Sequence, residues 1–323
     1  MTNECMNRYR NQFAIEFAKT MQINLPQWQK WQKEYTRKLY GKGWLTTYFL
    51  SFLAGFMPGK NERHYSLKVH FVLAVILCIA SICTAISLEN KNYQFDIKNK
   101  LFPLLLSVFS KNIIYGVGGI PYIEYNTSLL LNKDVGYDFV DDNFSGVYND
   151  VPFVISESEI SNIKKFKNGK SERRLLFKGI AMHFKMQKKI KSRVLIYSKN
   201  IFNRVPDRFE KVTMESEEFN KKYNVYVQKG SNADGQVEAR YLFNTVFLER
   251  FMQLQTSFRV NKMQCSIYGN SMLILLATNK DLFEMNHLFK RIDDIHQYQH
   301  LFDEFASVLS FIDVLNLSSR TGL

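Results

Sequence analysis

Val69 to Leu88 reads VHFVLAVILCIASICTAISL, without a formal charge. As an α-helix, these roughly twenty residues are long enough to cross the hydrocarbon core of a bilayer. Because the run is internal, we interpret it as a retained anchor rather than a cleaved signal peptide. The chain that follows is charged and mixed in character. The sequence therefore predicts a membrane-anchored protein with a soluble domain.

A weaker apolar run precedes the first, from Gly43 to Gly59. Its length is at the lower limit for a span. If both runs cross, they form a helical hairpin, and the Lys and Arg residues on the two outer flanks place both ends in the cytoplasm. If only the run 69–88 crosses, the soluble domain lies on the other side. We favour the hairpin, and thus an inner-membrane protein whose soluble domain is cytoplasmic.

The N-terminal segment is basic and amphipathic. Trp28, Trp31, Tyr35 and Leu39 recur at helical spacing, with cations between them. Such a helix suits the lipid headgroup level, or it packs its aromatic stripe against the rest of the protein. The predicted organisation is a basic segment (1–42), a membrane anchor (43–88, with spans 43–59 and 69–88), a connecting amphipathic helix and loop (89–135) and a soluble α+β domain (136–323).

Composition limits the classes of partner. The chain has 323 residues, of which 46% are hydrophobic, and its formal net charge is +13. In a membrane protein we attribute that excess to cytoplasmic retention and to attraction for anionic lipid, in preference to nucleic-acid binding. The four cysteines form no disulfide framework or CxxC pattern, which is typical of a reducing compartment.

From about Gly136 the pattern changes to short runs rich in Val, Ile, Tyr and Phe, which predict strands. The basic run 185–191 looks like a charged turn between two of them. Gly269-Asn270 looks like the turn of a hairpin. The predicted strands are 151–160, 173–186, 192–199, 221–229, 237–243 and the two halves of 263–278.

Two helices complete the predicted domain. Asn244 is a suitable N-cap for a helix over about 245–257, with Phe247, Phe251 and Leu254 on its inner face. Apolar residues at helical spacing predict a long helix over roughly 286–315. The predicted fold class is α+β: a transmembrane helix or hairpin, followed by a mainly antiparallel sheet with a long C-terminal helix.

No pattern of residues predicts catalysis, a cofactor or a metal site. His296 and His300 have metal-ligand spacing, but a solvated helix face is the better interpretation. The glycine cluster 116–119 lacks the pattern of a phosphate loop. Asp134, Asp138, Asp141, Asp142 and Asp150 lack calcium-loop spacing, and we interpret them as a solvated acidic loop.

Short pieces in a fixed order support a family resemblance. They are FSGVY (144–148), VPF (151–153), Ser156-Glu157, FKG (177–179), Phe219, YNVY (223–226), VEARY (237–241), LER (248–250), NKDLFE (279–284), LNL (315–317) and Arg320. From about Phe95 onward, the chain thereby resembles a bacterial membrane-associated family catalogued as domain of unknown function 3137. The resemblance implies a membrane segment ahead of an α+β domain. It implies no activity, because the function of the family is unassigned.

Four charged residues in these pieces form a candidate partner-docking patch. Glu238 and Arg240 share the outward face of a predicted strand, near Glu249 and Arg250 on the following helix. The alternative is a set of surface ion pairs with little effect on stability.

We expect a binding or scaffolding domain at the cytoplasmic membrane surface. Its expected partners are anionic lipid and an unidentified protein, and nucleic acid is disfavoured. One alternative is a membrane-tethered nucleic-acid-binding protein. Another is an enzyme whose site assembles from distant residues, such as the acidic loop together with His183.

Overall fold

The computed structural model describes residues 3–55, 64–110, 112–131, 135–165, 170–201, 205–230, 240, 242–280, 283 and 290–320. The chain divides into two compact units. Unit 1 comprises Met1–Phe13, Leu105–Phe283 and Tyr298–Leu323, and unit 2 comprises Ala14–Leu104 and Glu284–Gln297.

Unit 2 is built mainly from two helices, α1 (Asn3–Gly55) and α2 (His64–Leu106). The first residues of α1, up to Phe13, and the last two residues of α2 belong to unit 1. The aromatic stripe of α1 packs against α2. The Tyr35 hydroxyl donates to Asp96, and the Lys100 ammonium lies 3.2 Å from the centre of the Trp31 ring. In this region the stripe therefore faces protein rather than lipid.

The predicted transmembrane helix or hairpin is wrong. Among the residues that the structure describes, no helix combines the length and the apolar character that crossing a membrane requires. The run 69–88 is only the beginning of α2, which continues unbroken through Glu89, Lys91 and Asp96. The connecting amphipathic helix predicted within 89–135 is the end of the same helix, which stops at Leu106. In the weaker run, residues 43–55 belong to α1, and residues 56–59 lie outside the described residues.

The described part of unit 1 contains a seven-stranded sheet, and every strand pairing in this sheet is antiparallel. This confirms the α+β class with a mainly antiparallel sheet. The strand order is β1-β2-β3-β4-β6-β5, and β7 pairs with β4. The strands are β1 (Ile113–Tyr115), β2 (Tyr137–Tyr148), β3 (Val151–Lys165), β4 (Ser171–Ser198), β5 (Phe209–Val212), β6 (Tyr223–Gln228) and β7 (Lys262–Ala277).

β4 and β7 are each one strand where the sequence predicts two. Both predicted turns fall at the same irregularity of the β4–β7 ladder, because Ile190 pairs with Gly269 between two register shifts. Gly269 has a φ of 57°, which glycine adopts without strain. Gly179 permits a close approach of β7 to β4, since a Cβ there would collide with the Leu276 carbonyl oxygen.

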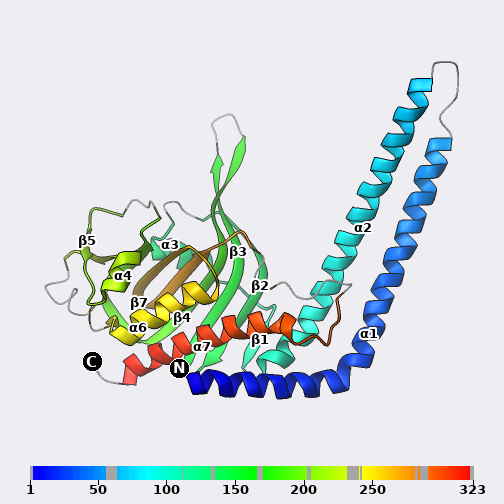
Figure 1. Ribbon diagram of the computed structural model, residues 1–323. Coiled ribbons are helices and arrows are strands. Elements are labelled where there is room, and N and C mark those ends of the chain that lie inside the picture. Colours follow the sequence, from blue (N-terminus) through cyan, green and yellow to red (C-terminus); the bar gives the residue numbers. More distant parts are fainter. Residues whose placement is uncertain are drawn as a thin grey trace. The chain divides into compact units, whose positions relative to one another are not determined.

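Helices cover both faces of the sheet. His183 of β4 lies beside Glu124 of α3 (Tyr122–Ser128), whereas the next residue, Phe184, contacts Phe311 of α7 (His296–Arg320). Successive strand residues point to opposite faces, so α3 and α7 lie on opposite sides. Figure 1 shows α6 (Thr245–Ser257) and α7 together across one face.

The C-terminal helix is shorter than predicted. α7 begins at His296 rather than near residue 286, and the prediction of a long helix is wrong in that respect. Asp294 accepts a hydrogen bond from the backbone N–H of His296, and Arg291 pairs with Asp293. These local side-chain bonds stabilise a turn in place of further helix.

Candidate functional site

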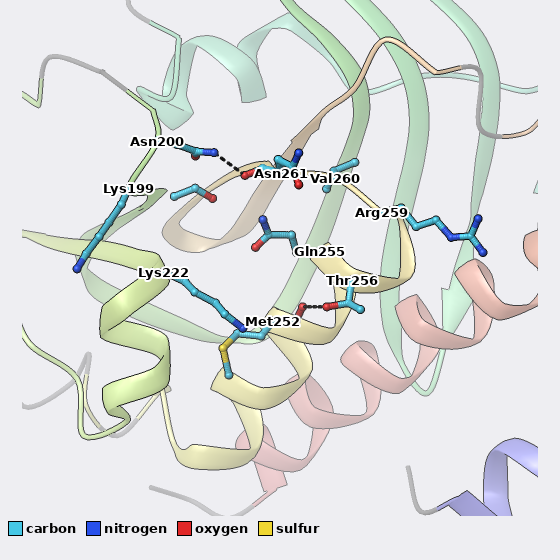
Figure 2. Close-up of a pocket in the computed structure, with 10 residues that line it drawn as sticks. Lys199, Asn200, Lys222, Met252, Gln255, Thr256, Arg259, Val260 and Asn261 are labelled. Carbon is cyan, nitrogen blue, oxygen red and sulfur yellow. Dashed lines mark hydrogen bonds between the residues drawn. The ribbon is translucent and has the colours of Figure 1, made fainter.

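A polar pocket of about 590 Å³ lies at the C-terminal end of α6, in unit 1 (Figure 2). Here the end of β4, the short helix α4 (Glu217–Lys222) and the start of β7 come together. The lining residues are Ser198, Lys199, Asn200, Lys222, Met252, Gln255, Thr256, Arg259, Val260 and Asn261.

Local sequence fixes the two helices that frame the pocket. Asn244 caps α6 as predicted, accepting from the Phe247 N–H at 2.9 Å, and the helix confirms the predicted bounds 245–257. Ser216 caps α4 in the same way. Lys222 stands in the last turn of α4, where the helix dipole favours a cation.

α6 ends in a left-handed residue that is not glycine. Arg259 has a φ of 50°, its N–H donates to the Thr256 carbonyl, and the Val260 N–H donates to the Gln255 carbonyl. These bonds form a Schellman motif, whose left-handed position usually holds glycine. Any side chain in this left-handed conformation costs about 1 kcal/mol relative to glycine. The backbone alone would therefore favour glycine at the position of Arg259.

Amide side chains occupy the interior of the pocket. Figure 2 shows the Gln255 side chain near its centre, with its Oε1 accepting from the Tyr223 hydroxyl. The Asn200 amide donates to the Asn261 carbonyl at 3.0 Å. Because an amide both donates and accepts, these groups suit a ligand with polar backbone or hydroxyl groups.

Arg259 points away from this centre, toward α7 (Figure 2). Its guanidinium lies 3.3 Å from Nδ1 of His300. Its charge also acts on Glu304, which is only 8% exposed. Burial raises the pKa of Glu304 to about 8; Arg259 opposes this rise, whereas Glu157 and Asp303 add to it. The carboxyl group is therefore largely protonated at neutral pH.

A second pocket of about 860 Å³ adjoins the first and shares Asn200, Arg259, Val260 and Asn261 with it. We call the two pockets together the basic groove. None of the described residues that line either pocket carries a carboxylate. The cations that line the basic groove are Lys178, Lys199, Lys222, Arg259, Lys262 and Lys280.

Two of these cations are paired with carboxylates. Lys178 pairs with Glu159, and Lys222 pairs with Glu218 at 2.8 Å. Lys199, Lys262 and Lys280 have no ion-pair partner among the residues that the structure describes. Unpaired cations around a concave surface without carboxylates create a positive potential that attracts anions.

A separate polar cluster lies on the α3 face of the sheet. The Glu124 carboxylate accepts from Lys185 at 2.8 Å and from the Tyr268 hydroxyl at 2.7 Å, and it lies 3.4 Å from Nε2 of His183. Burial alone would raise the pKa of Glu124, but these hydrogen bonds and the nearby cations lower it. Burial lowers the pKa of His183 to about 4, so its imidazole is neutral at pH 7.

The predicted docking patch stays a prediction. Glu238 lies outside the described residues, and Arg240 and Glu249 are exposed. Arg250 is half-buried and donates to Gln253 at 2.6 Å. The strand predicted over 237–243 is not present in its described residues, because Arg240 and Leu242 are helical.

Other predicted groups are dispersed. His183 lies beside Glu124, and no described contact joins it to Asp141, Asp142 or Asp150. Asp142 is buried and accepts from the Tyr115 hydroxyl, so it is not part of a solvated loop. Asp134 and the side chain of Asp138 lie outside what the structure describes. Among the described residues, no three side chains are grouped as a metal ion would require.

Little in the sequence indicates the basic groove. Its lysines lie on three separate elements, β4, α4 and β7, or in the loops that follow the two strands, and single lysines near strand ends are common on protein surfaces. The one available signal is Arg259, which follows the C-cap of α6 at the position where glycine is usual.

Residues 175–317 match the family described as "Protein of unknown function (DUF3137)". This confirms the predicted family resemblance, and the matched range contains every residue that lines the basic groove. The match supports neither the bacterial origin nor the membrane association that the resemblance implied.

Other comparisons add little. No curated protein matches the chain. The crystal structure of the mycobacterial trehalose monomycolate transport factor A, TtfA, is similar over 60% of this chain and 92% of its own, with 9% sequence identity and a TM-score of 0.26. So low a TM-score supports no conclusion about fold or function.

Proposed function

We propose that this DUF3137 domain is a binding module whose basic groove takes an acidic segment of a partner protein. The observation behind the proposal is the lining of the groove, whose described residues include six cations and no carboxylate. Charge complementarity of this kind speeds association and discriminates against basic partners.

The uncharged lining favours a peptide over a nucleic acid. Gln255, Asn200 and Asn261 offer amide groups to a peptide backbone. Among the described residues that line the basic groove, the one aromatic side chain is Phe177, which is buried, whereas single-stranded nucleic acid is usually held by stacking on exposed aromatic rings.

The experiment measures binding of a fluorescein-labelled oligoglutamate peptide to the full chain by anisotropy, at low and high salt. We expect affinity to fall with salt. Lys199→Glu and Lys262→Glu should each weaken binding about tenfold, which corresponds to roughly 1.4 kcal/mol. Both lysines are exposed, so the fold should tolerate the change.

The matched control is Lys211→Glu, an equal charge change at an exposed residue of β5 that lines neither pocket. It should bind as the unmodified protein does. Equal binding by the groove variants would refute the proposal. Tighter binding of an oligothymidine, lost in the same variants, would replace it with nucleic-acid binding.

A further inference from the structure

One part of the sheet extends as a two-stranded ribbon. The pairing of β2 with β3 reaches Ser161, and the pairing of β7 with β4 begins at Gly179. Between these limits, residues 162–165 of β3 and 171–175 of β4 form what we call the arm. Figure 1 shows this hairpin extending beyond the other strands of unit 1.

The arm exposes apolar side chains on one face. Ile163 is 42% exposed and Leu175 is 54% exposed. Ile163 pairs with Arg173, and Ser161 pairs with Leu175, so alternation along each strand brings both apolar side chains to the same face. Arg173 lies on that face too and donates to Ser161 at 3.0 Å.

The charge of the arm is positive. Lys164, Arg173 and Arg174 are exposed strand residues, and exposed Lys170 directly precedes β4. Glu172, opposite Lys164 in the ladder, is the one carboxylate among the described residues of these segments. The arm is thus a narrow amphipathic ribbon with a cationic surplus.

We propose that the arm binds the surface of anionic phospholipid, separately from the cations of the basic groove, with whose lining the arm shares Leu175. Apolar side chains beside cations suit the headgroup region, where aliphatic groups enter the acyl boundary and cations contact phosphate. A two-stranded ribbon has little stability of its own and gains from a surface that covers its apolar face.

Other occupants fit less well. A stable protein interface buries about 800 Å² on each partner, which a ribbon with two exposed apolar side chains does not provide. The described residues of the arm include no aromatic side chain on which a base could stack. Charge and narrow apolar width together favour a lipid surface.

The test is sedimentation of the full chain with vesicles of phosphatidylglycerol and phosphatidylcholine, compared with phosphatidylcholine alone. Arg174→Glu should weaken affinity for the anionic vesicles roughly tenfold. Leu175→Ser should weaken it several-fold, because the variant loses its apolar contact with the acyl boundary. Arg174→Glu should leave the weak binding to phosphatidylcholine unchanged, whereas Leu175→Ser should weaken that binding as well.

Two controls match these changes in kind. Lys211→Glu reverses an exposed charge on β5, and Val246→Ser removes an exposed apolar side chain on α6. Both should bind vesicles normally, as should Lys199→Glu in the basic groove. An equal loss with Lys199→Glu would assign vesicle binding to the groove and overturn the role of the arm.

Three further results would overturn the proposal. One is vesicle binding that both arm variants leave unchanged. Another is loss of duplex DNA binding in place of lipid binding. The third is a change in oligomeric state with the same variants, which would mean that the arm contacts a second copy of the chain.

Discussion

Glu124 and Glu304 are both packed against the sheet, but they lie on opposite faces and have different neighbours. Glu124 accepts hydrogen bonds from Lys185 and Tyr268, and its pKa is lowered despite burial. Glu304 is buried near Glu157 and Asp303, and its pKa is raised to about 8. Burial opposes ionisation in both, so hydrogen-bonded partners decide which carboxyl is ionised.

The comparison separates two roles for a buried carboxyl group. Glu124 ties a seven-residue helix to two strands through charge-assisted hydrogen bonds. Glu304 is a neutral acid at neutral pH, next to the arginine that ends α6. The first should stabilise the fold when ionised, and the second should stabilise it only when protonated.

The largest expected effect follows Glu304→Gln. The unfolded carboxyl ionises near pH 4.5 and the folded one near 8, so between these values the native state binds the extra proton. Stability is therefore lost as pH rises from 4.5 to about 8, by roughly 4 kcal/mol. Glutamine stays neutral, so the variant should gain about that much at pH 8 and little at pH 4.5, measured by urea unfolding.

Glu217→Gln is the control, because that carboxylate is exposed on α4 and has no ion-pair partner among the described residues. It should leave the pH profile unchanged. If Glu304→Gln raised the unfolding free energy equally at both pH values, the gain would come from packing. That result would contradict a raised pKa for Glu304.

A smaller effect of the opposite sign is expected at His183. The unfolded imidazole binds a proton below pH 6.5, whereas the folded one does so only near pH 4. The protein should therefore lose roughly 3 kcal/mol of stability as pH falls across this interval. His183→Gln should flatten that part of the profile in urea unfolding at pH 4.5 and 7. A variant whose stability falls in parallel with the unmodified protein would contradict the neutral buried imidazole.

The smallest of the three effects is expected for Glu124→Gln. This variant should lose about 2 kcal/mol of unfolding free energy at pH 7, because Lys185 and Tyr268 lose a charged hydrogen-bond acceptor. The lowered pKa places this stabilisation above pH 4.5 and removes it as pH falls through the folded value. The difference from the unmodified protein should shrink in acid. In a His183→Gln background the loss should change, because the two groups interact; strict additivity would refute their coupling.

Local signals in the sequence predicted α6 well. Asn244 and the spacing of Phe247, Phe251 and Leu254 define its start and its inner face, and both depend on neighbours within a few residues. The contacts of Glu124 had no such signal, because Lys185 and Tyr268 are distant in the sequence and meet it only through the sheet.

Two errors of prediction have the same cause. The basic run 185–191 and Gly269-Asn270 each resemble a turn locally. In the structure they face each other across the β4–β7 ladder, at the place where the register of the ladder shifts. Hydropathy misled in a similar way at Val69–Leu88, because the run gives no sign that its helix continues into a charged half.

The length of β4 also affects how the chain folds during synthesis. β4 is paired on one edge by β3, which is made just before it, but its other edge waits for β7, which ends at Ala277. Until β7 leaves the ribosome, the stretch of β4 from Gly179 to Tyr197 keeps an open edge that can pair with other chains. Ladders between segments so distant in sequence form slowly, so the nascent protein should need chaperone protection for an unusually long time.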